Sequence, residues 1–302
     1  MLLTNLFINL FVVLIVAVNV KFISSTCHTF TSNYTVCELW IDDVSDFPSN
    51  SQVSQACMSG QIDIFPQVVC TKFNNLAVIS ASKLKVVEID ENSFSDCLKL
   101  RKLDLESCGI TEIHENAFNS NRQLEILNLN QNRLVTLHVD LFQHLLMLRE
   151  LHLDENPLEE LPDEIFKPLA SSLERISMHN CNVSGVWKAK WLQDHKNLNY
   201  VDIGGNKITE IERNSFNLRQ EIFALLIDDN QLQVLDFMSF GSLKSLQYLI
   251  AGGNQLHEMD FFIFKHPENL KFADLRGNIC ANATFIDKFE ILQGLEDDCF
   301  KS

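Results

Sequence analysis

Two histidines and three carboxylates are the residues of this sequence best suited to metal chemistry. His152 and Asp154 lie in one segment with Glu150 and Glu155, and His179 lies further along the chain. Two imidazoles and a carboxylate could hold zinc if the fold brought them together. We expect a solvated polar face with one His–Asp contact instead, because the sequence offers no third fixed histidine, closed cavity or lid. No metal and no cofactor are therefore expected.

Other catalytic patterns are missing from the sequence. It contains no phosphate-binding loop, no serine-centred nucleophile elbow and no Cys–His pair in a catalytic context. Enzymatic activity is therefore not expected.

The charge of the chain restricts its partners. With 24 Lys and Arg against 40 Asp and Glu, the formal net charge is -16. This charge repels phosphate backbones and anionic lipid headgroups, so we expect no nucleic-acid partner. The 46% of hydrophobic residues is enough for a folded interior.

A repeated block L-x-x-L-x-L-x-x-N/C-x-L with a period of about 24 residues positions these side chains. Its clearest copies begin at Leu124 and Leu148. Alternating Leu residues predict a short strand with one buried face, and the stacked strands would form a parallel sheet. The blocks begin at Leu76, Leu100, Leu124, Leu148, Leu173, Leu198, Ile222, Leu246 and Leu270.

Three further columns follow from the same period. An Asn amide can satisfy a buried donor and a buried acceptor where the chain leaves the strand, which predicts a ladder of Asn132, Asn156, Asn206, Asn230, Asn254 and Asn278. An aromatic column should line the back of the coils, formed by Phe94, Phe118, Phe142, Phe166, Trp191, Phe216, Phe240 and Phe264. An aliphatic column should accompany it, formed by Ile89, Ile113, Leu137, Leu161, Val186, Ile211, Leu235 and Met259.

Over about residues 76–280 the sequence resembles the leucine-rich-repeat superfamily. The resemblance implies an α/β solenoid: a horseshoe with a parallel concave sheet, an irregular or short-helical convex side and disulfide-containing caps. The segments 65–76 and 275–280 look like those of secreted leucine-rich-repeat proteins of flies and midges, which are similar to Toll-receptor ectodomains and insect immune recognition factors. No transmembrane helix, signalling domain or coiled coil follows, so receptor signalling is not carried over.

Four segments are expected along the chain. Residues 1–25 resemble a signal peptide, with an uncleaved anchor as the alternative. Residues 26–75 form an N-terminal cap, 76–279 nine repeats, and 280–302 a C-terminal cap. Sequons at Asn33, Asn182 and Asn282 agree with export and predict glycosylation. We expect a secreted, extracellular protein with no membrane span after signal cleavage.

The nine cysteines divide between the caps and the ladder. In an oxidising compartment we expect Cys280 to pair with Cys299, and Cys27 with Cys37. The pairings Cys70–Cys97 and Cys57–Cys70 both remain open, as does a disulfide to another chain through Cys57 or Cys97. In the ladder positions, Cys108 and Cys181 should be free buried thiols.

The residues that point outward from the concave sheet change character along the solenoid. The first half is charged, with Lys102, Asp104, Glu106, Asn128, Glu150, His152, Asp154, Arg175 and His179. The second half presents an apolar patch that we interpret as a ligand site, formed by Tyr200, Leu226, Tyr248, Ile250 and Phe272 and flanked by Asp202 and Asp228. The alternative is that a cap covers these strands, or that the apolar residues are scattered without a role.

The sequence therefore predicts a noncovalent recognition protein for a protein or glycoconjugate ligand, monomeric or weakly homo-oligomeric. Innate immune recognition is implied by the resemblance alone. The alternative is a structural or extracellular-matrix protein that self-associates. An inhibitor that covers an enzyme would share the same features.

Overall fold

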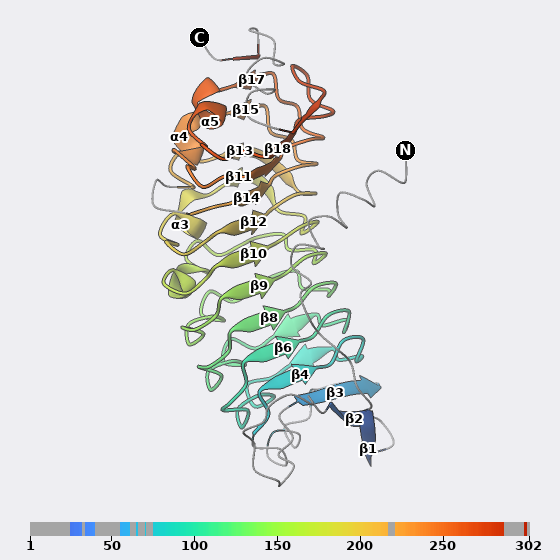
Figure 1. Ribbon diagram of the computed structural model, residues 1–302. Helices are drawn as coiled ribbons and strands as arrows, with labels where there is room; N and C mark the ends of the chain where they lie inside the picture. Colours follow the sequence, from blue (N-terminus) through green and yellow to red (C-terminus); the bar gives the residue numbers. More distant parts are fainter. Residues whose placement is uncertain are drawn as a thin grey trace.

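The computed structural model describes residues 25–31, 34–39, 55–60, 65, 70, 75–216, 221–286 and 299–300, the first three of these ranges by their backbone only. The predicted signal peptide, except Ser25, and the sequon residue Asn33 lie outside these residues. Figure 1 shows the coils stacked into one elongated solenoid, with β1 to β3 at one end and β18 near the other. The predicted boundaries of the caps stay predictions.

The main sheet contains one short parallel strand from each coil between β4 and β18, flanked by β1, β2 and β3 at one edge and by the antiparallel β19 at the other. In sheet order these are β1 (Ser25–Thr31), β2 (Tyr34–Leu39), β3 (Gln55–Gly60), β4 (Val78–Ser80), β6 (Lys102–Asp104), β8 (Ile126–Asn128), β9 (Glu150–His152), β10 (Arg175–Ser177), β12 (Tyr200–Asp202), β14 (Ala224–Leu226), β16 (Tyr248–Ile250), β18 (Phe272–Asp274) and β19 (Thr284–Phe285).

Smaller elements lie on the rest of each coil. Three parallel pairs join β5 (Glu88–Ile89) with β7 (Glu112–Ile113), β11 (Ser184–Trp187) with β13 (Lys207–Ile211), and β15 (Val234–Leu235) with β17 (Glu258–Met259). The helical turns are η1 (Lys167–Leu169), α3 (Ala189–Leu192), α4 (Phe237–Phe240) and α5 (Phe261–Lys265).

The parallel register of β4 to β18 follows the predicted period. Each strand pairs with the equivalent residues of the next coil, as Leu127 pairs with Leu151 and Leu225 with Leu249. The middle residue of each of these strands is buried, and its two neighbours point away from the core, as alternation in a strand requires. The predicted solenoid with a parallel sheet is confirmed.

The asparagine ladder is present with the predicted hydrogen bonds. Asn132 donates from Nδ2 to the carbonyls of Leu105 and Leu129, and its Oδ1 accepts from the backbone N–H groups of Cys108 and Ile110. In the same position the Cys181 thiol donates to the carbonyl of Leu153 at 3.0 Å. A thiol thus replaces the donor of the amide but not its acceptor.

The aromatic column is buried as predicted, from Phe94 to Phe264. The aliphatic column has one error. Val186 is 42% exposed, and Trp187 takes the buried position beside Trp191. A register shift between Gly185 and Val186 in the β11–β13 pair causes this change, because one extra residue turns the next side chain to the other face.

Each coil turns after its strand through a left-handed residue, a feature that the sequence analysis did not anticipate. The residue before each ladder position has φ between 48° and 74° in Ser107, Gln131, Glu155, Asn180, Gly205, Asp229, Gly253 and Gly277. Non-glycine residues adopt this conformation at a cost of about 1 kcal/mol or more. The requirements of the stack therefore override local preference at these turns.

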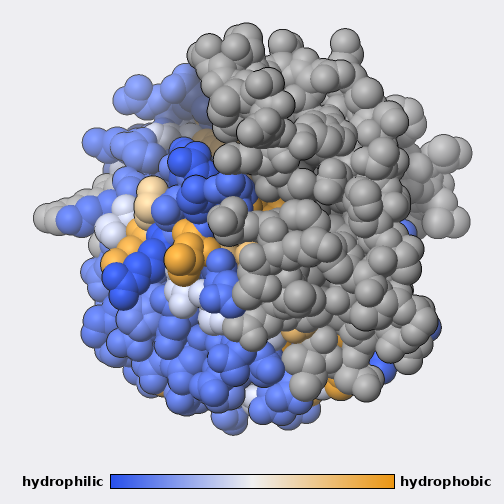
Figure 2. Space-filling model, turned by 90° about the horizontal axis from the view of Figure 1, so that it is seen from below, coloured by the Kyte–Doolittle hydropathy of each residue, from blue (hydrophilic) through white to orange (hydrophobic). Residues whose placement is uncertain are grey.

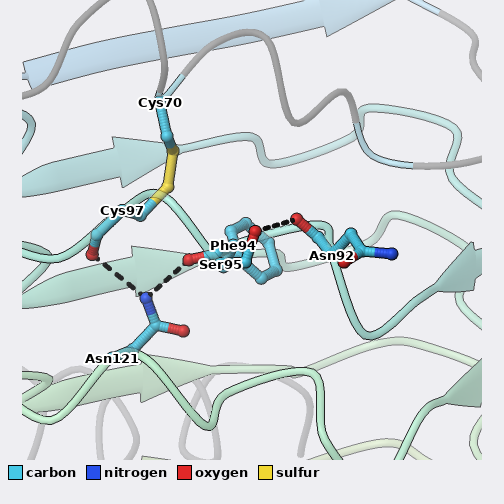
Figure 3. The surroundings of a disulfide bond; sticks show 6 residues. All are labelled: Cys70, Asn92, Phe94, Ser95, Cys97 and Asn121. Carbon is cyan, nitrogen blue, oxygen red and sulfur yellow. Dashed lines mark hydrogen bonds between the residues drawn. A yellow bond between two sulfur atoms is a disulfide. The ribbon is translucent and has the colours of Figure 1, made fainter.

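One disulfide joins the predicted N-terminal cap to the repeats, and a second lies within the predicted C-terminal cap. Cys70 pairs with Cys97, with 5.0 Å between their Cα atoms, and Cys280 pairs with Cys299. Figure 3 shows that Asn121 supports the first disulfide from the next coil, because its Nδ2 donates to the carbonyls of Phe94 and Cys97. The pairing that the sequence left open is therefore Cys70–Cys97 in this structure.

The N-terminal strands are described by their backbone alone. The β1–β2 pairing is antiparallel and places Cys27 opposite Cys37, and the β2–β3 pairing places Cys37 opposite Cys57. The side chains lie outside the described part of the chain, so the predicted Cys27–Cys37 disulfide stays a prediction.

Candidate concave recognition surface

The strand register brings the predicted patch residues together. The first residues of β12, β14, β16 and β18 are direct neighbours and form one row, which runs from Tyr200 through Ala224 and Tyr248 to Phe272. The last residues of the same strands form a second row, which runs from Asp202 through Leu226 and Ile250 to Asp274. We call these two rows the concave array.

Residues of the concave array pack against one another as well as facing outward. Tyr200, Leu226, Tyr248 and Phe272 are half-buried, whereas Ile250 is 8% exposed and Ala224 is 2% exposed. The accessible apolar surface is therefore formed by the half-buried side chains, and Ile250 contributes mainly its edge.

A cation already lies over one tyrosine of the array. The Arg175 guanidinium carbon is 4.3 Å from the centre of the Tyr200 ring, which is cation–π geometry. The same ring lies 6.3 Å from that of Phe223, measured between centroids. Burial raises the pKa of the Tyr200 hydroxyl, so this tyrosine stays neutral and serves as an aromatic surface.

The charged half of the face does not form the zinc cluster. The Asp154 carboxylate accepts hydrogen bonds from the Ser177 hydroxyl at 2.5 Å and from the His179 backbone N–H at 2.7 Å. His152 contacts Glu150 instead, with 3.4 Å between Nε2 and Oε2. Among the described residues, no three His, Cys, Asp or Glu side chains converge on a possible metal position.

His179 lies between the charged and apolar halves. Its Nδ1 is 3.4 Å from Oδ1 of Asp202, on the next coil. The hydrogen bond to Asp202, and then the charges of Asp202 and Asp228, raise the pKa of His179 to about 9 despite partial burial. The imidazole is therefore protonated at neutral pH and compensates the charge of Asp202.

Asp228 has a different environment from Asp202. Burial, followed by repulsion from Asp202, raises the pKa of the Asp228 carboxyl to about 7. At the other end of the array, Arg276 donates to both oxygens of Asp274 at 2.5 to 3.2 Å. Within the described part of the chain, Asp228 has no cation at ion-pair distance, whereas Asp202 and Asp274 each have one.

The glycines beside the array have intramolecular roles. A Cβ atom on Gly204 would lie 2.7 Å from Oδ1 of Asp228 and 2.8 Å from Nδ1 of His179, so the missing side chain makes room for this pair. Gly205 and Gly253 occupy the left-handed turn position, with φ of 64° and 65°. Contacts within the chain therefore account for these glycines.

A second apolar surface was missed in the sequence analysis. On α4 and α5, Met238 is 51% exposed and Phe262 is 47% exposed. The Phe262 ring lies 5.9 Å from Phe237, and Lys265 Nζ lies 5.6 Å above it. The sequence did carry a signal, because most residues that match Met238 and Phe262 in other coils are polar, such as Asn116.

Figure 2 views the molecule from below, where the described residues are largely hydrophilic around a small hydrophobic patch.

The sequon residue Asn282 is exposed, and its Oδ1 accepts a hydrogen bond from the Gly277 N–H. Asn182 is half-buried in a left-handed conformation with φ of 62°. The occupancy of these sequons stays a prediction.

The comparison with known families agrees with the repeat geometry. Residues 98–158 and 196–256 match the family model described as Leucine rich repeat. The fold is that of a leucine-rich-repeat protein. No curated protein sequence matches the chain. The predicted fold class and the sequence-based resemblance to the leucine-rich-repeat superfamily are confirmed.

Solved leucine-rich-repeat structures are similar to this one. A chain from the octameric complex of Latrophilin 3, Unc5D and FLRT2 (LRR) is 23% identical, with a TM-score of 0.59 over 80% of this chain and 72% of the other. The Leptospira interrogans LRR protein LIC12759 is 20% identical, with a TM-score of 0.59 over 72% and 59%. The leucine-rich-repeat domain of APL1B is 16% identical, with a TM-score of 0.56 over 72% and 62%. These likenesses show the fold alone.

Two general features accompany the assignment. Leucine-rich-repeat folds are typically non-enzymatic scaffolds that bind other proteins. In the described residues, every helix is too short or too polar to span a bilayer.

Proposed function

We propose that this chain is a secreted, noncovalent recognition protein that binds a protein or glycoconjugate through the concave array. The observation that carries the proposal is the contiguous row of aromatic and aliphatic side chains on one face of the parallel sheet. The contact residues we propose are Tyr200, Leu226, Tyr248, Ile250, Phe272, Asp202 and Asp228.

The chemistry of the array suits protein recognition. Half-buried tyrosine and phenylalanine rings are held in place by their neighbours, so they lose little conformational entropy when a partner covers them. Aromatic residues in such positions often contribute most of the binding free energy. The similar structure that contains FLRT2 is described as a complex with other proteins, which supports a binding role for this fold.

Secretion and an immune role are parts of the same proposal with separate support. The apolar segment near the N-terminus and the sequons support export. Disulfides in both caps also suit an oxidising compartment. Innate immune recognition is supported by the resemblance to insect leucine-rich-repeat proteins.

The proposal is tested with the full chain in two steps. Affinity purification from the secreting tissue, followed by mass spectrometry, identifies candidate partners. Binding of a purified partner is then measured for Tyr248→Ala combined with Phe272→Ala. We expect at least about 30-fold weaker binding by a chain that is still folded, because one such aromatic contributes about 2 kcal/mol.

The matched control is Phe262→Ala, which removes a half-exposed phenylalanine from α5 instead of from the sheet. It should leave partner binding unchanged. Unaltered binding by the Tyr248 and Phe272 double variant would place the ligand elsewhere.

Self-association is the second candidate function, favoured by the exposed apolar residues of α4 and α5. If the protein acts as a self-associating matrix component, light scattering of the wild-type chain should show oligomers that Phe262→Ala or Met238→Ala dissociates. A recognition protein should be monomeric without its ligand.

A further inference from the structure

The carboxylates of the concave face differ in whether they already have a cation. Asp202 pairs with His179 and Asp274 pairs with Arg276. Asp228 is the one of these three carboxylates that has no such partner among the described residues. Asp228 stands two residues after Leu226, at the point where the chain leaves β14. A half-buried carboxylate without an ion pair of its own, although the charge of His179 acts on it, therefore lies at the end of β14 after Leu226.

The Asp228 side chain extends toward the preceding coil, where its Oδ1 lies 2.7 Å from the position that a Cβ atom on Gly204 would take. The equivalent residues of the coils on either side are Gly204 and Gly252, which have no side chains. The next residues along the strand rows are Leu226 and Ile250, which lie in register on β14 and β16. A ligand side chain that approached Asp228 along β14 would place its stem against Leu226 and its charged end at the carboxylate.

Lysine and arginine have this composition, with an aliphatic stem and a cationic head. The protein itself already uses the combination nearby, where Arg175 lies over the Tyr200 ring of the same array. A net charge of -16 also favours the approach of a basic partner.

We propose that the concave array binds a basic residue of a protein partner, with the aliphatic stem on Leu226 and Ile250 and the cation paired with Asp228. This inference rests on the proposed function, because it assigns the partner chemistry of the same surface. The occupant is an arginine or lysine side chain on a protein, and an anionic or uncharged ligand would leave Asp228 without a role.

The inference has a distinctive pH signature. The pKa of the Asp228 carboxyl is raised to about 7, so this group changes its charge near neutral pH. A bound cation should favour its ionised form, because opposite charges attract. The ionised fraction rises from about a tenth at pH 6 to about nine tenths at pH 8, so affinity should increase by up to about tenfold.

The neighbouring charges do not oppose this direction. The groups that face Asp228 from its own turn and from the adjacent coils are His179, Asp202, Asp229, Asp274 and Arg276. His179 has its pKa raised to about 9 and stays charged through most of this interval, and the pKa of the Arg276 guanidinium is raised further by Asp274.

The test uses N-acetyl-L-arginine amide as the probe and its neutral near-isostere N-acetyl-L-citrulline amide as the comparison. Binding is followed through the labelled methyl resonances of Leu226 and Ile250 in the full chain. We expect saturable shifts with the arginine derivative, at least about fivefold weaker binding of the citrulline derivative, and tighter arginine binding at pH 8 than at pH 6.

Three variants identify the carboxylate. Asp228→Asn should remove the preference for arginine, and Asp228→Glu should keep it. Asp229→Asn removes the same charge from the adjacent exposed residue and should behave like the wild type. Equal binding of the two probes, absence of saturable shifts, or an equal effect of Asp229→Asn would overturn the inference.

The same variants separate this inference from the proposed function when a purified partner is used. If the Tyr248 and Phe272 double variant loses the partner while Asp228→Asn keeps it, the concave face is the binding surface but the basic anchor is wrong. If the double variant keeps the partner, the proposed placement itself is wrong.

Discussion

Substitution of Asn206 by Ala tests whether the asparagine ladder holds the coils together. Asn206 is 6% exposed. Its Nδ2 donates to the Met178 carbonyl at 2.8 Å, and its Oδ1 accepts from the N–H groups of Cys181 and Val183, both at 3.0 Å. The amide therefore connects three backbone groups of the preceding coil.

The expected magnitude follows from which groups lose their partner. The carbonyl of Ile203 also accepts from Asn206, but it keeps a second bond from Asn230 at 2.9 Å. In the described part of the chain, the Met178 carbonyl and the N–H groups of Cys181 and Val183 have no second hydrogen-bond partner. Each stranded buried group costs about 1–3 kcal/mol, and neighbouring losses are less than additive, so we expect about 3–5 kcal/mol.

The assay is urea unfolding monitored by circular dichroism. Asn197→Ala is the matched control, because Asn197 is exposed and makes one hydrogen bond, to the Ser171 carbonyl. It should change the free energy of unfolding by about 0.5 kcal/mol or less. Asn206→Cys should be less damaging than Asn206→Ala, since a thiol can restore the donor as Cys181 does. If Asn206→Ala and Asn197→Ala had equal effects, the reasoning about stranded groups would be refuted.

Two further predictions concern titratable groups. The pKa of Asp228 is raised by burial to about 7 and that of His179 by Asp202 to about 9, so the folded state binds both protons more tightly than the unfolded state. The free energy of unfolding should therefore fall as pH rises, through about pH 4 to 7 for Asp228 and about pH 6.5 to 9 for His179. Asp228→Asn should remove the fall between about pH 4 and 7, which amounts to about 1–3 kcal/mol after allowance for solvent screening. Asp229→Asn should leave this fall in place. Urea unfolding midpoints at several pH values measure the free energy of unfolding for each variant. Burial also raises the pKa of the Cys108 and Cys181 thiols to about 12, so iodoacetamide should modify them only after unfolding. Mass spectrometry measures this modification. Rapid labelling of either thiol in the native protein would contradict their burial.

Much of the fold could be predicted from the sequence because each repeat carries its own local pattern. Alternating Leu residues determine which side of each strand is buried, as in Leu127 and Leu151. The period then places equivalent residues side by side, which is why Tyr248 and Phe272 were expected to be neighbours and are. These features depend only on short-range periodicity and on stacking of like units.

The tertiary structure decided features that depend on the details of contact between coils. A register shift buries Trp187 instead of Val186, and the turn after each strand forces Gln131 into a left-handed conformation. The pairing of Cys70 with Cys97 was one of two possibilities until the distance between coils was known.

The electrostatics of the concave face were also beyond the sequence. Composition shows that Asp202 and Asp228 are both present, but not that His179 neutralises the first and leaves the second unpaired. Local periodicity determines which residues share a face of the solenoid. The partner of a given charge depends on distances of a few ångströms across adjacent coils, and only the packed structure sets those distances.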